Sequence, residues 1–488
     1  MKPNRNRALS STLTGLILVG LTLTAFYAQS SKSKDRYTTY EEARPVLEAL
    51  SELLPAELHG ASPEDLPSIW ATWVVRRDAE IRARLVQGDE DSLVNFLLFG
   101  TSFTHKPRIT LAALAKFSGK YSESMLAPTA EVAAFVDSIK ARADDLVQAT
   151  SQPGANERLL FTRQVAESKG YDLKTVTGRQ KVKDYILASL ARVMNEQAGY
   201  AKVLESARLL GDPSSEFAER SKLFSNRGLS SDTSLRPGFA IERALRSIRD
   251  QRLLAPGSVR RVAIIGPGLD FTDKQDGYDF YPQQTIQPFA TIDTLLRLGL
   301  ARGADLRVTT LDLSSRVNDH LRRARARAHS GTGYVVQLPR DLSGRWVPET
   351  VSYWKQFGEY IGVPVTPAAV PAGAGDVKVR AVRIRPTTVS TVVPEDLNIV
   401  LQRLELSAGD QFDLVIATNI LVYYDVFEQS LALANTQRML RPDGFLLSNN
   451  ALLELPGHRM RSVGYETVVY SDKPNDGDHI VWYQRLPD

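Results

Sequence analysis

Two glycines stand directly after a short apolar run and offer a place where a ligand can approach the backbone. The run is Val262–Ile265, and Gly266, Pro267 and Gly268 follow it. An unbroken apolar run of this kind is typical of a strand buried on both faces of a parallel sheet. Glycines at its carboxyl end permit a sharp turn and leave room for a ligand, because they carry no Cβ. Taken alone, the pattern also fits an ordinary turn from strand to loop.

A carboxylate stands where the next strand is expected to end. The second apolar run, Leu306–Leu311, is followed by Asp312. A dinucleotide-binding fold places its acidic residue about 20 residues after the glycines, much closer than Asp312, and requires a third glycine. The position of that third glycine is occupied by Phe271. The pattern therefore argues against NAD(P).

The second half of the chain alternates strand and helix patterns, which indicates a doubly wound parallel sheet. Strands are predicted at Val262–Ile265, Leu306–Leu311, Val377–Ile384, Phe412–Thr418 and Phe445–Ser448, and helices at Pro288–Leu300, Arg316–Ala328, Leu397–Leu404 and Val426–Met439. The runs Glu466–Tyr470 and His479–Arg485 are typical of a closing antiparallel hairpin.

The order of these pieces resembles the class I S-adenosylmethionine-dependent methyltransferases, and among them the chemotaxis-receptor (CheR-type) carboxyl methyltransferases. The stretches that carry the resemblance are Ile265–Asp270, Leu311–Ser314, Phe412–Asp425 and Met439–Leu447. The last two, in tandem, are the most specific. The resemblance covers about residues 255–488. It implies a Rossmann-like α/β fold with a seven-stranded methyltransferase sheet, S-adenosylmethionine as cofactor, and methyl transfer to a small-molecule or protein acceptor, with a carboxylate or another oxygen as the candidate group.

The resemblance also assigns roles to residues at the strand ends. The cofactor has a ribose diol and no phosphate, so it suits a close backbone turn and a carboxylate that accepts hydrogen bonds. The expected catalytic residues are Asn419 and Tyr423, and the residues expected against the substrate are Tyr278, Tyr281 and Tyr424. The cofactor contacts implied by the family pattern are Gly266, Pro267, Gly268, Asp270, Asp312, Leu313, Thr418 and Asn419.

For some of these residues a purely structural role is an open alternative. Tyr423 and Tyr424 fit packing at a helix start equally well, and Asp413, at the start of its strand, is expected to lie away from the site. No clear acid follows the predicted third strand, where many relatives bind the adenine. The insertion between Phe271 and Phe289 is acidic and aromatic, and it is interpreted as a lid, a substrate wall or a surface loop.

The first half of the chain has a helical pattern without alternating strands. Residues 38–250 show helical periodicity and predict an all-α domain, with a boundary to a second domain at residues 255–488. The absence of cysteine excludes disulfides and cysteine-ligated zinc, and no histidine pair has metal-binding spacing, so we expect no metal. A net charge of +4 does not favour a nucleic-acid partner.

The N-terminus carries the pattern of a secretory signal or membrane anchor. Lys2, Arg5 and Arg7 precede the uncharged residues 8–28, and a polar tether extends to residue 36. An uncleaved anchor is favoured, although basic residues flank both sides of the segment and leave its orientation open. We expect a membrane-anchored protein, facing the cytoplasm if it uses S-adenosylmethionine. The alternative is an exported protein whose methyltransferase-like fold no longer catalyses and serves as a binding or scaffold module.

Overall fold

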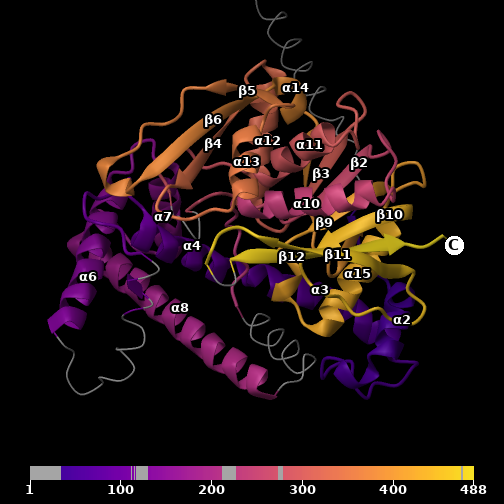
Figure 1. Ribbon diagram of the computed structural model, residues 1–488. Coiled ribbons are helices and arrows are strands. Elements are labelled where there is room, and N and C mark those ends of the chain that lie inside the picture. The colour runs from indigo at the N-terminus through magenta and orange to yellow at the C-terminus, as the bar shows by residue number, and fades with distance from the viewer. Residues whose placement is uncertain are drawn as a thin grey trace, which may run out of the picture.

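A single seven-stranded sheet organises the computed structural model, which describes residues 35–110, 113, 114, 116, 130–210, 227–272, 278–473 and 476–487 (Figure 1). The strand order is β11-β12-β10-β9-β2-β3-β7. The strands span Arg261–Ile265 (β2), Arg307–Asp312 (β3), Val392–Asp396 (β7), Phe412–Ala417 (β9), Leu440–Ser448 (β10), Met460–Val469 (β11) and Gly477–Arg485 (β12). The strands from β7 to β10 run parallel, and β12 is antiparallel to both β10 and β11. The predicted α/β class and closing hairpin are confirmed.

Helices cover both faces of this sheet, because alternate residues of each strand point to opposite sides. In β2, Val262 and Ile264 belong to one hydrophobic core, and Ala263 and Ile265 belong to the other. The first core is closed by α10 (Arg236–Asp250), α11 (Gln287–Arg297), α12 (Ser315–His329) and α13 (Pro348–Gln356). The second is closed by α2 (Tyr40–Ala49), α3 (Leu66–Ala83) and α15 (Val426–Met439).

The prediction for the third strand of the sheet was wrong. Val377–Ile384 forms β6 of a separate antiparallel sheet, in the order β4-β6-β5, with β4 at Tyr334–Asp341 and β5 at Gly362–Val365. Beside β3 lies β7 instead. The alternation of basic and apolar residues in β6 fits a strand with one solvated face, which antiparallel sheets allow. A short helix, α14 (Pro386–Val389), connects β6 to β7.

The predicted helix at Leu397–Leu404 was also wrong. The segment turns and then forms β8 (Gln402–Leu404), which pairs with β1 (Asp35–Tyr37) from the other end of the described chain. This pairing satisfies backbone groups that a helix would otherwise have satisfied internally. Short 3₁₀ turns lie at Ser51–Leu53, Ala372–Ala374 and Leu421–Tyr423.

The helices of residues 38–250 do not all belong together. A third core joins α4 (Leu85–Phe99), α6 (Ala130–Ser151), α7 (Glu157–Ser168) and α8 (Val176–Leu210), to one side of the sheet in Figure 1. Phe271 inserts into this core from the sheet, with its ring 5.8 Å from Phe96 and 5.2 Å from Phe161. The expected helical domain is thus divided, since α2, α3 and α10 pack on the sheet itself.

The predicted anchor at residues 8–28 lies outside the described residues. Within the described ranges, the helices are too short or too polar to cross a bilayer.

Trp73 tests whether α3 is part of the sheet's core. Its buried ring lies 5.2 Å from Trp70 and 5.9 Å from Phe427 of α15. We expect Trp73→Ala to lower the free energy of unfolding by about 3–5 kcal/mol, because a large cavity is left behind. Urea denaturation followed by circular dichroism measures the change.

The matched control is Val75→Ala on the exposed side of the same helix, which should change stability by less than about 0.5 kcal/mol. If Trp73→Ala left the unfolding transition of the sheet in place, α3 would be an independent unit.

Candidate functional site

A cavity of about 560 Å³ opens where the parallel strands end. The carboxyl ends of parallel strands are the usual ligand-binding edge of an open α/β sheet. Small-molecule sites commonly measure about 300–1,000 Å³. The lining residues in the loops after the parallel strands include Gly266, Gly268, Leu313, Leu397, Ile399, Thr418, Asn419, Asn449 and Asn450, and Asp312 ends β3.

The turn after β2 requires both of its glycines. Gly266 and Gly268 have φ angles of +63° and +64°, which side-chain-bearing residues rarely adopt. A Cβ on Gly266 would lie 2.1 Å from Cδ1 of Ile420, and a Cβ on Gly268 would lie 2.6 Å from the carbonyl oxygen of Ser231. Both glycines line the cavity, whereas Pro267 between them does not.

Asp312 brings a carboxylate to the cavity from the neighbouring strand. Its carboxylate accepts hydrogen bonds from the backbone N–H of Ser314, at 2.7 Å, and from that of Gly268. Burial raises the pKa of Asp312 to about 7, despite these neutral donors. The glycine turn and the carboxylate therefore form one connected unit across β2 and β3.

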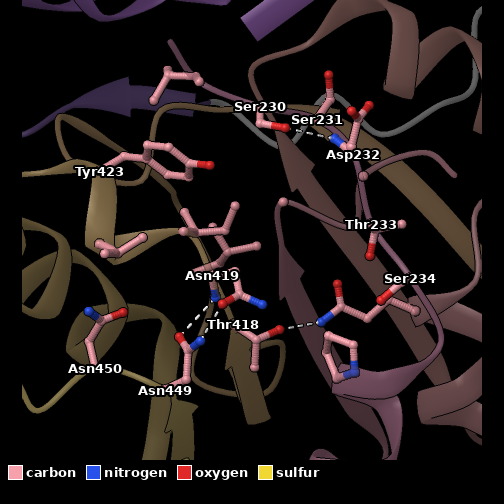
Figure 2. Close-up of a pocket in the computed structure, with 18 of the residues that line it drawn as sticks. Ser230, Ser231, Asp232, Thr233, Ser234, Thr418, Asn419, Tyr423, Asn449 and Asn450 are labelled. Atoms are coloured by element: carbon pink, nitrogen blue, oxygen red, sulfur yellow. Dashed lines mark hydrogen bonds between the residues drawn. The ribbon is translucent and has the colours of Figure 1, made fainter. Parts of the chain in front are cut away.

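The end of β9 supplies Thr418 and Asn419. Gln287 of α11 donates a hydrogen bond to the hydroxyl of Thr418 at 2.8 Å. Asn419 has a φ of +59°, a left-handed conformation that asparagine tolerates better than most residues. It forms a reciprocal pair with Asn449 after β10, in which Asn419 N–H donates to Asn449 Oδ1 at 2.8 Å and Asn449 Nδ2 donates to Asn419 Oδ1 (Figure 2).

Tyr423 and Tyr424 lie in the turn that precedes α15. Both line the cavity, and Figure 2 shows the Tyr423 ring beside it. Tyr424 is also buried, with the guanidinium of Arg84 at 5.8 Å from its ring centre, and burial raises its pKa. Arg84 Nη2 donates to the carbonyl oxygen of Tyr423 at 2.8 Å, which fixes this turn against α3 and α4.

The remaining predicted residues lie elsewhere. Asp270 accepts hydrogen bonds from Tyr281 Oη at 2.9 Å and from Gln284 Nε2 at 2.8 Å, and the ring of Tyr278 packs under the Arg108 guanidinium at 4.7 Å. None of Asp270, Tyr278 and Tyr281 lines the cavity. The structure does not bring them together with the other predicted site residues.

A buried arginine explains this placement. Arg158 of α7 donates hydrogen bonds to the backbone carbonyl oxygens of Phe271, Asp279 and Tyr281. The carboxylate of Asp279 in turn accepts from the backbone N–H groups of Thr101 and Ser102, at 2.7 and 2.9 Å. At Phe271, Asp279 and Tyr281 the insertion is therefore clamped to the helical core, whereas Gln287, near its end, lines the cavity.

The sequence analysis missed one wall of the cavity. The hydroxyl-rich run from Ser230 to Ser234 lines it, just before α10 (Figure 2). This run lies beside the glycine turn, because Leu269 N–H donates to Ser231 O at 2.7 Å and Thr233 N–H donates to Leu269 O at 2.9 Å. The run of hydroxyl side chains was the available signal, but it lies within residues 38–250, which the sequence predicted to form a helical domain.

The closing hairpin supplies a second unpredicted group of lining residues, namely Tyr470, Asp476, Gly477, Asp478 and His479. Strand β7, at the other end of the sheet, ends in an acidic residue, Asp396. It forms an ion pair with Arg82 at 2.7 Å and is not among the lining residues. The apolar side chains of Leu397 and Ile399 line that end of the cavity instead.

The ionisable side chains of the lining are mainly acidic. They are Asp232, Asp312, Asp476 and Asp478 against Arg236 and His479. Arg236 is paired with Asp476 at 2.9 Å. Such a lining favours a cationic ligand over a phosphate. Within the described ranges, no group of histidine, aspartate and glutamate side chains is arranged to hold a metal ion.

Comparisons with known proteins give only distant similarity. No protein-family model matches the chain, and no curated protein matches it. One similar solved structure is the N-methyltransferase NodS from Bradyrhizobium japonicum WM9, with 12% identity, a TM-score of 0.25, and 51% of this chain and 98% of that chain covered. Another is the magnesium protoporphyrin IX methyltransferase ChlM from Synechocystis PCC 6803 with bound SAM, with 12% identity, a TM-score of 0.25, and coverage of 55% and 90%. Similarities of this size assign neither a family nor a substrate to this chain.

Asn419 offers a test of the strained strand end. We expect Asn419→Ala to lower the free energy of unfolding by about 1–3 kcal/mol, because it loses the hydrogen bond from Asn449 Nδ2 and keeps an unfavourable φ. Asn419→Gly loses the same hydrogen bond but relieves the backbone, so it should be less destabilising by about 1 kcal/mol. Chemical denaturation of both variants measures the difference. A glycine variant as unstable as the alanine variant would mean that the left-handed backbone carries no cost here.

Proposed function

We propose that this protein is an S-adenosylmethionine-dependent methyltransferase. The observation that carries the proposal is that a glycine turn after β2 and the buried carboxylate of Asp312 after β3 face one acidic cavity. The cofactor is a cation with a ribose diol, so it suits this donor set better than a dinucleotide with its phosphates. The sheet order and the motif resemblance of residues 255–488 support the same assignment.

The residues present fit the cofactor in distinct ways. Asp312 would accept hydrogen bonds from the ribose hydroxyls, and Gly266 and Gly268 would allow the backbone to approach the ligand. Leu313, Leu397 and Ile399 would provide apolar contact for the adenine ring. Thr418 and Asn419 lie at the end of β9 and would face the reacting end of the ligand.

The contribution of the chain to the reaction is mainly positional. When bound, S-adenosylmethionine supplies a methyl group that is already activated by the positive sulfur. The protein then has to align the acceptor with this carbon and exclude water from it. Tyr423 and the Asn419–Asn449 pair form a polar wall at the place where an acceptor would enter.

A non-catalytic binding or scaffold protein is the competing function. It is favoured by the engagement of Asp396 with Arg82, which leaves the adenine end without a free carboxylate. The two functions differ in whether the cavity binds the cofactor at all.

Cofactor binding should depend on the protonation of Asp312. Because burial raises its pKa to about 7, the carboxylate is largely protonated below this pH and ionised above it. The ionised form accepts hydrogen bonds and attracts the sulfonium, so affinity should rise by up to about tenfold from pH 6 to pH 8. Isothermal titration calorimetry of S-adenosylmethionine into the full chain measures this.

The matched variant is Asp312→Asn, which should bind S-adenosylmethionine at least about tenfold more weakly than the wild type at pH 8. Its affinity should change with pH only through the titration of the ligand itself. Asp319→Asn, on the exposed side of α12, serves as the unchanged control. Absence of binding to folded wild-type protein would overturn the proposed function and favour the scaffold.

A further inference from the structure

The half of the cavity beyond Asn419 is built from the ends of β10, β11 and β12. In the sheet order these strands lie on the opposite side of β9 from β2 and β3, which carry the glycine turn and Asp312. If the cofactor occupies the β2–β3 side, the acceptor has to enter over β10 and β12. The side chains of this half therefore indicate which acceptor it suits.

A chain of hydrogen bonds crosses this half at the level of the strand ends. Asn419 pairs with Asn449, and the Asn449 side chain also hydrogen-bonds Asp478 at the start of β12. Tyr470, directly after β11, donates its hydroxyl to Asp478 Oδ2 at 2.5 Å. Asp478 is thus held by neighbours from two different strands, and it lines the cavity.

Asp478 differs from Asp476, the other carboxylate that this hairpin brings to the cavity, in having no cation beside it. Asp476 is paired with Arg236 at 2.9 Å. Among the described residues no lysine, arginine or histidine forms an ion pair with Asp478, and its hydrogen-bond partners Tyr470 and Asn449 are neutral. His479, the other base of the lining, has its Nδ1 within 2.9 Å of the Thr467 hydroxyl and its ring 5.0 Å from that of Tyr465.

We infer that the methyl acceptor is an amine, and that Asp478 binds its ammonium form and takes up its proton. This inference rests on the proposed function. A carboxylate without an ion-pair partner attracts an ammonium group and repels a carboxylate, so it disfavours the carboxylate acceptor expected from the sequence resemblance. The cavity already has neutral donors that orient Asp478, so the ligand has to supply only the countercharge.

The reaction balances with the groups named. The bound ammonium passes one proton to the Asp478 carboxylate and becomes a neutral amine. The nitrogen lone pair then forms a bond to the methyl carbon, while the carbon–sulfur bond breaks and its electron pair stays on sulfur. The products are a methylated ammonium, neutral S-adenosylhomocysteine and a proton that Asp478 returns to solvent.

The electrostatic surroundings of Asp478 agree with this role. Burial and the neighbouring Asp476 raise its pKa, whereas the hydrogen bonds from Tyr470 and Asn449 lower it, and the net direction is upward. A carboxylate with a raised pKa is a stronger proton acceptor.

The test uses a matched set of cofactor analogues and the full chain. In each analogue a nitrogen replaces the sulfur of S-adenosylhomocysteine and carries a short alkyl arm that ends in an ammonium, a carboxylate or a methyl group. The arm projects from the position of the transferred methyl and so probes the acceptor half. We expect the ammonium arm to bind about tenfold or more tightly than the carboxylate arm, measured by calorimetry.

Asp478→Asn keeps the size of the side chain and an acceptor for Tyr470, and it should reduce this preference to within about threefold. Asp472→Asn, on the same hairpin but outside the cavity lining, should leave the preference unchanged. Equal binding of the two charged arms to the wild type, or tighter binding of the carboxylate arm, would overturn the amine inference. Binding of S-adenosylhomocysteine itself distinguishes the two proposals. If it does not bind, the proposed function is overturned; if it binds and the charged arms show no such preference, only the amine inference is overturned.

Discussion

The pairing of β2 between β3 and β9 is the constraint on which the rest of the site depends. Parallel strands end at the same edge of a sheet, so three loops that are far apart in sequence meet at one place. Ile265 lies beside Leu311, and Ile264 lies beside Ile416, which brings the glycine turn between Asp312 and Thr418. A slip of one residue in either pairing would turn the alternate side chains away from their cores.

The walls of the cavity come from elements that are not part of this parallel unit. The run before α10 lies against the glycine turn through backbone hydrogen bonds, and the closing hairpin contributes Tyr470 and Asp478. At Phe271 and Asp279 the insertion after β2 lies away from the cavity, because Arg158 and Phe271 anchor it in the helical core. The helical core therefore holds the insertion, whereas the run before α10 and the hairpin line the cavity.

Two carboxylates lie on opposite sides of β9 in the cavity. Asp312 accepts hydrogen bonds from backbone donors on the β2–β3 side, and Asp478 accepts hydrogen bonds from neutral side chains on the β10–β12 side. Arg236 is committed to Asp476 and does not neutralise either of them. A cationic donor and a cationic acceptor can then occupy one cavity, because each has a carboxylate of its own to offset its charge.

The sequence alone determined the central strands, the glycine turn, Asp312, Thr418 and Asn419, because each of these is a local pattern at the end of an apolar run. Tertiary structure decided which strand pairs with β3 at the edge of the sheet. Val377–Ile384 has the stronger strand pattern, but only Val392–Asp396 pairs with β3. Tertiary contacts also decided that Asp270, Tyr278 and Tyr281 lie outside the cavity, since the backbone that carries them is held by Arg158, which is distant in the chain. Ser230–Ser234 and Asp478 reach the cavity for the same physical reason, because their positions depend on pairing with other segments of the chain.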